Sequence, residues 1–293
     1  YRAENQVLVT VGGSEGIDMA IRTLVCPGDE VLVVEPSFVC YKPLVEVSGG
    51  VAVPLVTKEE DNFRLTAAAL EAAITPKTKL LVFPYPNNPT GAVMRREDLE
   101  PICRVLQKHK IYVLSDEIYS ELTYGGADHT SIAAMPGMAE RTVVINGFSK
   151  TYSMTGWRLG WLAAAAPVIA EIAKAHQYLV SSAVSFEMDA AARALTVDPT
   201  PMLKVYRARR KRVLAALNAM GLDAVEPAGA FYTFPSIKKF DLTSEAFCIK
   251  AIKEANVALV PGDCFGTEGH IRLSYCVSDQ DLDEGLNRLS TFI

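Results

Sequence analysis

The chain has 293 residues, a formal net charge of −5, 49% hydrophobic residues and 22% charged residues. These values are typical of a globular protein of one or two domains, and they provide no overall positive field for nucleic acid. No apolar run is long enough to cross a membrane and no signal peptide is evident, so we expect a cytoplasmic protein without a membrane partner. Six cysteines without a Cys-x-x-Cys pair fit a reducing compartment, and four scattered histidines predict no metal site.

Strand-like apolar runs alternate with helical periods over the first half of the chain. The expected strands lie at residues 7–11, 30–34, 51–56, 80–83, 111–114 and 142–145. The expected helices lie at about 14–25, 39–47, 66–74 and 96–108. This alternation predicts an α/β fold in which helices cover both faces of a mostly parallel (mixed) sheet. A short alanine run is closed by Pro167, and no element is assigned between it and Met202.

The pattern changes after about Met202. A long helix with a basic run at residues 207–212 is expected to end at Gly221, and the run indicates a solvated face or a subunit contact. Short strands follow at 230–234, 258–260 and 270–275, with helices near 244–255 and 278–290. We therefore predict a large domain over residues 1–203 and a small C-terminal α+β domain over residues 204–293.

Lys150 follows the expected strand at 142–145, and Arg158 comes eight residues later. The carboxyl edge of a parallel sheet is where open α/β folds bind ligands. Partial desolvation or a neighbouring cation can lower the pKa of a lysine enough to make it a nucleophile. A Schiff-base lysine and a phosphate-binding arginine on one loop would suit pyridoxal phosphate, although most lysines after a strand are solvated surface residues.

Other candidate groups follow other strands. Residues 12–16, Gly-Gly-Ser-Glu-Gly, could bind phosphate with helix amides and the Ser14 hydroxyl, or could form a glycine turn with a serine N-cap. Asn88 could donate to a phenolate oxygen or belong to a turn. Asp116 could pair with a pyridinium nitrogen while Tyr119 reaches the ring oxygen, or it could cap a short helix.

Two further residues complete the candidate set. Phe38 could lie over a planar cofactor, although an aromatic residue after a strand is more often part of the core. Arg272 lies among the apolar residues of 270–275 and could bind a substrate carboxylate or form an internal salt bridge. All these features follow different expected strands, at an edge where one ligand could touch them together.

At these motifs the chain resembles the class I/II pyridoxal-phosphate-dependent aminotransferases of fold type I, the aspartate aminotransferase superfamily. The shared runs occur in family order, and they are Pro-Asn-Asn-Pro-Thr-Gly, Ser-Asp-Glu-Ile-Tyr, Ser-Lys-x-x-x-Met-x-Gly-Trp-Arg-Leu-Gly, Gly-Ala-Phe-Tyr and Arg-Leu-Ser-Tyr. The resemblance implies a transaminase with pyridoxal 5'-phosphate and a homodimer. Family members carry a further segment before the position of Tyr1, so we expect the N-terminal part of the small domain to be missing here.

The resemblance also implies residue roles. Lys150 would bind the cofactor and shuttle the Cα proton, Asp116 would pair with the pyridine nitrogen, and Asn88 and Tyr119 would hydrogen-bond the ring hydroxyl oxygen. Arg272 would bind the substrate α-carboxylate, with Asn88 at the same substrate position. The other implied cofactor-binding residues are Gly13, Ser14, Glu15 (through its backbone amide), Phe38, Ser149 and Arg158. The Asn88–Pro89 bond is expected to be cis.

Two positions bear on specificity and phosphate binding. Gly147 stands where many family members have a serine phosphate ligand, and Ser14 stands where some aspartate-preferring members have lysine. We expect transfer of an amino group between an aromatic or broad range of L-amino acids and a 2-oxo acid such as 2-oxoglutarate. The alternatives are a carbon–sulfur β-lyase of the same fold and a truncated, non-catalytic cofactor-binding fragment.

Overall fold

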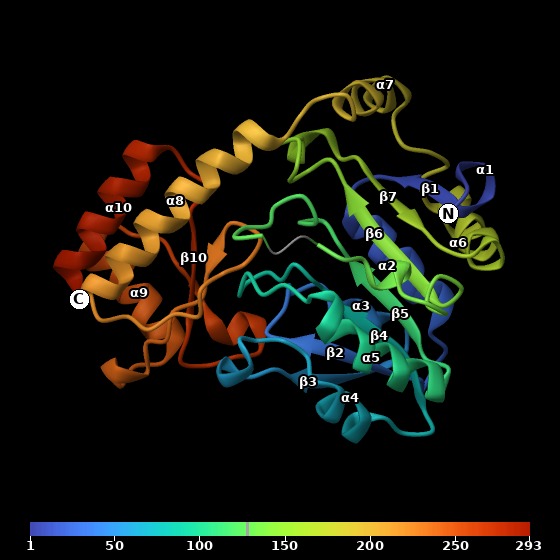
Figure 1. Ribbon diagram of the computed structural model, residues 1–293, viewed down its shortest axis with the longest axis horizontal. Coiled ribbons are helices and arrows are strands. Elements are labelled where there is room, and N and C mark those ends of the chain that lie inside the picture. The colour runs from blue at the N-terminus through green and yellow to red at the C-terminus, as the bar shows by residue number, and fades with distance from the viewer. Residues whose placement is uncertain (127–128) are drawn as a thin grey trace.

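The computed structural model describes residues 1–126 and 129–293, which form two sheets (Figure 1). The larger sheet has seven strands in the order β1-β7-β6-β5-β4-β2-β3. Neighbouring strands are parallel except where β7 pairs antiparallel with β1 and β6, so the predicted mostly parallel, mixed sheet is confirmed. The strands are β1 (Val7–Thr10), β2 (Glu30–Glu35), β3 (Val51–Val56), β4 (Thr78–Phe83), β5 (Tyr112–Asp116), β6 (Thr142–Gly147) and β7 (Gly160–Ala163).

Helices cover both faces of the large sheet. The helices in this part of the chain are α1 (Ala3–Gln6), α2 (Gly13–Leu24), α3 (Tyr41–Val47), α4 (Ala67–Ala73), α5 (Arg96–His109), α6 (Ala166–Leu179) and α7 (Ser185–Ala194). The helices α4 and α5 pack on one face, and α2, α3 and α6 pack on the other. Alternate strand residues supply the two faces: in β2, Leu32 and Val34 face α4 and α5, whereas Val31 and Val33 face α2 and α3.

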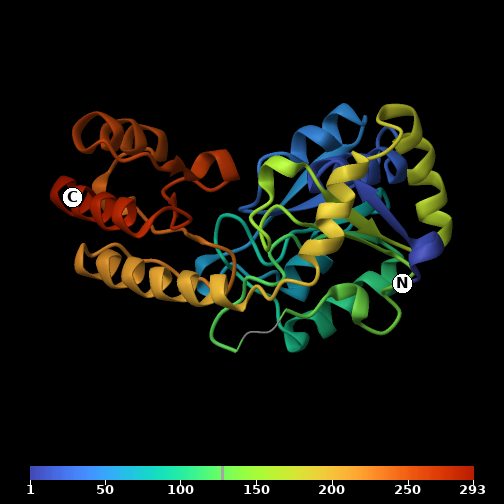
Figure 2. The same ribbon diagram turned by 90° about the horizontal axis from the view of Figure 1, so that it is seen from above.

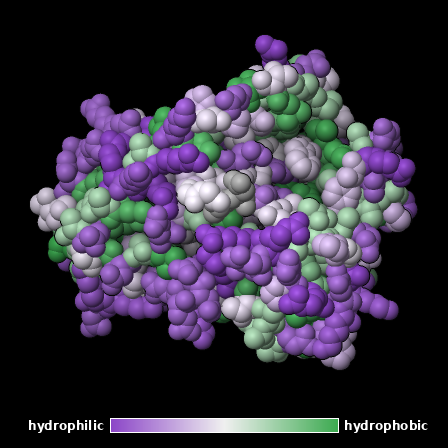
Figure 3. Space-filling model, viewed as in Figure 1, coloured by the Kyte–Doolittle hydropathy of each residue, from purple (hydrophilic) through white to green (hydrophobic). Residues whose placement is uncertain are grey.

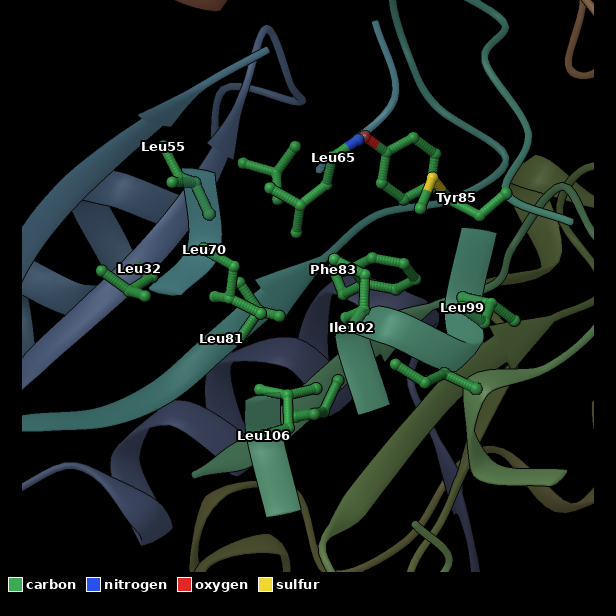
Figure 4. Packing of buried hydrophobic residues seen from close by; sticks show 14 of the residues in the cluster. Leu32, Leu55, Leu65, Leu70, Leu81, Phe83, Tyr85, Leu99, Ile102 and Leu106 are labelled. Carbon is green, nitrogen blue, oxygen red and sulfur yellow. Dashed lines mark hydrogen bonds between the residues drawn. The ribbon is translucent and has the colours of Figure 1, made fainter. Parts of the chain in front are cut away.

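The packing between the sheet and α5 fixes where the central strands end. Leu81 and Phe83 of β4 lie in one buried cluster with Leu99, Ile102 and Leu106 of α5 (Figure 4). Complete burial of one such side chain contributes roughly 1.5–3 kcal/mol. The strands β4 and β5 are thereby held in place up to the turns that follow them.

The sequence pattern does not predict α1, β7, α6 or α7. Pro167 lies in the first turn of α6, where a proline costs no intrahelical hydrogen bond, so it helps to begin this helix instead of closing an apolar run. The strand β7 has only four residues and begins at Gly160, which leaves too short a pattern to identify.

The C-terminal part begins with the long helix α8 (Thr200–Ala219) and contains a three-stranded antiparallel sheet of order β8-β10-β9. Both views place the N- and C-termini at opposite ends of the molecule (Figures 1 and 2). The boundary predicted between residues 203 and 204 falls inside α8 and stays a prediction. The remaining elements are β8 (Tyr232–Thr233), β9 (Val260–Pro261), β10 (Ile271–Ser274), α9 (Ser244–Ala255), α10 (Asp279–Phe292) and the 3-10 helices η1 (Glu59–Asp61), η2 (Ile132–Ala134), η3 (Thr155–Trp157), η4 (Lys238–Phe240) and η5 (Gly262–Phe265).

The basic run of α8 forms ion pairs within the chain. Arg209 contacts the carboxylate of Asp279 at 2.9 Å, and Arg212 contacts the same carboxylate, at the start of α10. Arg210 pairs with Glu226. Residues 207, 208 and 211 and the partner carboxylates are exposed, so the run also forms the solvated face that the sequence indicates, and the subunit contact stays a prediction.

The described residues, 1–126 and 129–293, contain neither a membrane-spanning helix nor a cluster of metal-binding side chains. No helix among them combines the length and apolar character needed to cross a bilayer. No group of three or more histidine, cysteine, aspartate or glutamate side chains among them is arranged to hold a metal ion.

Candidate active site

A cavity of about 360 Å³ lies at the carboxyl edge of the large sheet and extends to the small sheet. Its lining comes from turns after β1, β2, β4, β5 and β6 and from β8 and β10. This is the edge at which open α/β folds bind ligands. The predicted site residues on the lining are Gly13, Ser14, Phe38, Asn88, Asp116, Tyr119, Ser149, Lys150, Arg158 and Arg272.

Lys150 lies in the turn after β6, with its amine close to two aromatic rings. Its Nζ is 5.9 Å from the ring centroid of Tyr119 and 5.8 Å from that of Phe231. Burial lowers the pKa of Lys150, and the nearby charge of Arg272 lowers it further, while Asp116 opposes the shift. A larger fraction of this amine is therefore neutral near neutral pH than for an exposed lysine, which favours nucleophilic and general-base chemistry.

Asp116 is the last residue of β5 and is almost completely buried. Its Oδ2 accepts a hydrogen bond of 2.7 Å from the Tyr41 hydroxyl, and its Oδ1 accepts one of 3.2 Å from the Ile118 amide. Burial raises the pKa of Asp116, and these two hydrogen bonds oppose the increase. Two donors thus hold the carboxylate in a fixed orientation toward the cavity.

Asn88 and Arg272 join the two parts of the molecule. Nη1 of Arg272 on β10 donates a hydrogen bond of 2.9 Å to Oδ1 of Asn88, which follows β4. The Asn88–Pro89 peptide bond is cis, as predicted. The Arg272 guanidinium also lies over the rings of Tyr232 and Phe265, with its carbon 4.6 and 5.0 Å from their centroids. Stacking leaves the guanidinium edge free for planar acceptors.

Tyr119 and Tyr232 share a hydrogen bond across the cavity. Their hydroxyl oxygens are 3.0 Å apart. Burial raises the pKa of Tyr119 well above its ordinary value, and the neighbouring Tyr232 adds to this shift. The Tyr119 hydroxyl therefore stays protonated and can donate to a ring oxygen.

The turn between β1 and α2 forms a compact anion cradle. Gly12 has a φ of +77°, and a Cβ at this position would lie 2.6 Å from Nη2 of Arg158. Gly160 lets β7 approach closely, because a Cβ there would lie 2.6 Å from both the carbonyl carbon of Gly12 and the amide nitrogen of Gly13. Helix geometry leaves the first amides of α2 without intrahelical partners, and Ser14 adds a hydroxyl.

The structure adds detail to the predictions for Glu15 and Gly147. The Glu15 side chain is not on the cavity lining; it turns away to His176, so only its backbone amide remains a candidate ligand. Gly147 has no space for a side chain, since a Cβ would lie 2.8 Å from the Gly160 Cα. Close packing of β6 on β7 thus explains the missing serine. Ser149 lies on the lining, and its carbonyl accepts a 2.9 Å hydrogen bond from Thr155.

Three lining residues with polar side chains were not among the sequence candidates: Tyr41, Tyr232 and Thr155. Tyr41 lies three residues after Phe38, about one helical turn, and that spacing could have placed both at the same ligand. Tyr232 belongs to the Gly-Ala-Phe-Tyr run, which marks the resemblance without giving the tyrosine a role. Nothing in the local sequence distinguishes Thr155.

The lining fits a ligand with an anionic group, a planar ring and a carboxylate-bearing substituent. The glycine turn and Arg158 suit a phosphate, and Phe38 and Asp116 suit a pyridine ring. The buried Nε of Arg272 has no hydrogen-bond partner among the described residues, so this guanidinium can serve a further acceptor. These groups match the chemical parts of pyridoxal phosphate and an amino acid.

Comparisons with known proteins agree with this chemistry. A family model described as aminotransferase class I and II matches residues 1–289. YugH of Bacillus subtilis, which is named as an aminotransferase without a substrate, is 46% identical over all of this chain and 77% of its own length. A probable N-acetyl-LL-diaminopimelate aminotransferase of Bacillus subtilis is also 46% identical, over all of this chain and 75% of its length.

A solved aromatic aminotransferase from Pyrococcus horikoshii is 42% identical, with a TM-score of 0.96 over 98% of this chain and 79% of that one. Other relatives are named aspartate aminotransferases, so the names alone do not select a substrate. The fold is therefore that of the fold type I aminotransferases, which use pyridoxal phosphate. The chain belongs to the class I and II aminotransferase family.

Proposed function

We propose that this aminotransferase transfers the amino group of an aromatic or broad range of L-amino acids to a 2-oxo acid such as 2-oxoglutarate. The observation that carries the proposal is the meeting of three groups at one cavity. These are the Lys150 amine, the Asp116 carboxylate held by Tyr41, and the Asn88–Arg272 pair.

The cofactor half of the site would be organised by buried donors and acceptors. Pyridoxal phosphate, when bound, supplies an aldehyde that condenses with amines and a ring that withdraws electrons from the substrate Cα. Asp116 would hold a proton on the ring nitrogen, and the hydrogen bond from Tyr41 favours the ionised form of this carboxylate. Asn88 and Tyr119 would donate to the ring hydroxyl oxygen, while Phe38 would stack on the ring.

Lys150 would both bind the cofactor and move the proton. Once a substrate amine displaces it, its neutral Nζ would take the proton from the substrate Cα and deliver it elsewhere on the bound molecule. The lowered pKa of Lys150, caused first by burial, supports this role because the base must be unprotonated. The rings of Tyr119 and Phe231 lie beside the amine and contribute to its partial burial.

The charges on the lining support a donor with an uncharged side chain. The described lining has three cationic side chains, Lys150, Arg158 and Arg272. The proposed roles assign the first to the aldehyde, the second to the phosphate and the third to the α-carboxylate. No further cation on that lining is left for a side-chain carboxylate, and Ser14 is too short and uncharged to replace one.

An assay of both half-reactions tests the proposal. The protein is incubated with pyridoxal phosphate, L-phenylalanine or L-aspartate, and either 2-oxoglutarate or pyruvate, and the new amino acid is measured. Phenylalanine should be the better donor. Release of pyruvate and ammonia from cystathionine without an added 2-oxo acid, with no transamination, would instead establish the carbon–sulfur lyase.

We also propose a cytoplasmic homodimer. Large apolar side chains are exposed in and beside α7, with Tyr178, Phe186 and Leu195 exposed to 85%, 68% and 64%. Figure 3 shows apolar surface at the upper right, where Figure 1 places α7. Exposed apolar groups of this kind support a protein–protein contact. Light scattering should give twice the chain mass of 31.8 kDa, and a monomer would contradict the proposal.

A further inference from the structure

Glu15 lies in the first turn of α2, yet its carboxylate points away from the cavity. One oxygen, Oε2, accepts a hydrogen bond from the backbone amide of Val11, just before the glycine turn. The other, Oε1, is 2.9 Å from Nδ1 of His176, in the last turn of α6. Because a carboxylate only accepts, Nδ1 of His176 carries the proton of this hydrogen bond. Both side chains are nearly buried.

This arrangement leaves the start of α2 open to an external anion. A glutamate at the third helical position commonly folds back and accepts a hydrogen bond from the helix N-terminus. Here Glu15 accepts from Val11 outside the helix, so its carboxylate does not occupy the amides of Gly13 and Ser14. The same contact fixes the chain where it enters the turn, and a 2.9 Å hydrogen bond from Gly12 to Thr10 fixes the next residue.

The contact with His176 also keeps the negative charge of Glu15 away from the proposed phosphate site. A free carboxylate one residue from Ser14 would repel a phosphate bound at this helix end. His176 holds the Glu15 carboxylate on the side of α2 that packs against α6. Arg158 lies on the other side, against Gly12, where it faces the cavity. The Glu15 carboxylate and the anion cradle beside Arg158 therefore lie on opposite sides of the β1–α2 turn.

We propose that Glu15 and His176 are a positioning pair that shapes the β1–α2 turn for the phosphate of the cofactor. The inference rests on the proposed cofactor site. It assigns no contact between either side chain and the cofactor. The pair holds the Val11 backbone in place and thereby positions the backbone amides of Gly13, Ser14 and Glu15 at the start of α2.

The phosphate itself provides the test, because pyridoxal has the same ring and aldehyde without it. The dissociation constants of pyridoxal 5'-phosphate and of pyridoxal are measured by isothermal titration on the full chain freed of cofactor. Glu15→Ala removes an N-terminal acceptor, so it should weaken pyridoxal phosphate binding about tenfold while pyridoxal binding changes less than about twofold. Glu15→Gln keeps an acceptor for Val11 and should recover most of the loss.

Variants of the partner helix complete the experiment. His176→Ala should reproduce the selective loss, and His176→Asn, which can still donate to Glu15, should partly restore binding. Glu171→Gln is the matched control, since Glu171 lies on α6 but forms only an exposed pair with Lys174. This control should bind both compounds like the parent chain.

Three outcomes would overturn the inference. Equal losses for the two compounds would show a general structural role, and unchanged dissociation constants in all variants would show no role for the pair. If Glu15→Ala fails to fold, the two dissociation constants measured for His176→Ala decide in the same way. Failure of the parent chain to bind either compound would overturn the proposed cofactor site and this inference with it.

Discussion

The two sides of the cavity are built differently. On the proposed cofactor side, the carboxyl ends of β5 and β6 belong to one sheet, and Asp116 is held by Tyr41 from a helix packed on that sheet. On the proposed substrate side, Arg272 comes from the small sheet and reaches Asn88, which follows β4 of the large one. The first side depends on one packed core, whereas the second depends on how two parts of the chain meet.

This difference implies separable effects of mutation. Changes on the cofactor side should alter the visible spectrum and the rate of the chemical step. Changes on the substrate side should weaken amino acid binding and leave the cofactor spectrum intact. Four predictions test this separation, beginning with the largest expected effect.

Lys150→Ala removes the proposed nucleophile and base. Turnover should fall by roughly 10³-fold or more, because one residue serves two catalytic functions. The absorbance band of lysine-bound cofactor should also disappear. Steady-state assays and an absorbance scan measure both, with Lys174→Ala, an exposed lysine on α6, as the control. Retained transamination by Lys150→Ala would remove this lysine from the mechanism.

Arg272→Met should weaken amino acid binding and leave the cofactor band in place. Loss of a charged, stacked hydrogen-bond donor should raise the KM for the amino donor about 100-fold, while the cofactor band stays unchanged. Arg209→Gln is the control, because Arg209 pairs with an exposed aspartate and neither residue is on the lining. A lost cofactor band in Arg272→Met would mean that the two sides cannot be separated.

Tyr41→Phe should weaken the cofactor side without removing any group from the substrate side. The Asp116 carboxylate loses a hydrogen bond that favours its ionised form, so its pKa should increase further. The kcat should decrease about tenfold with little change in KM. Steady-state kinetics with a fixed 2-oxo acid measure this split. A change in KM alone would place Tyr41 on the substrate side.

The pH dependence of cofactor capture should reveal the environment of Lys150. The neutral amine reacts, so the capture rate should increase with pH and level off above the pKa of Lys150. Burial and Arg272 both lower this pKa, so the plateau should begin at a lower pH than for an ordinary lysine. Arg272→Met should move the curve to higher pH. Stopped-flow absorbance measures the profile, and a shift to lower pH would contradict the assigned electrostatics.

The large sheet and most candidate residues could be predicted from sequence because they produce local patterns. Apolar strands bounded by glycine, proline and polar turns mark the ends at which Lys150, Asp116 and Asn88 lie. Parallel strands bring such ends to one edge, so the pattern also indicates that these residues meet. The helix α9 was predicted with its observed bounds, since Thr243 caps it and Asn256 ends it.

The features that were missed depend on contacts between distant segments. The bond from Tyr41 to Asp116 joins residues 75 positions apart, and the Tyr119–Tyr232 contact joins residues 113 apart. Pro167 was misleading because proline ends most helical patterns but is accepted in a first turn. The direction of the Glu15 side chain depends on His176, in a helix that the pattern did not reveal.

The most direct measurement identifies the lysine that binds the cofactor. The protein is mixed with pyridoxal phosphate, treated with borohydride to fix the lysine linkage, digested, and mapped by mass spectrometry. The account predicts one principal label, on Lys150, and its loss in Lys150→Ala with no label appearing elsewhere. Labelling of a different lysine in the native chain, or no stable label at all, would contradict the central claim that this cavity is the cofactor site.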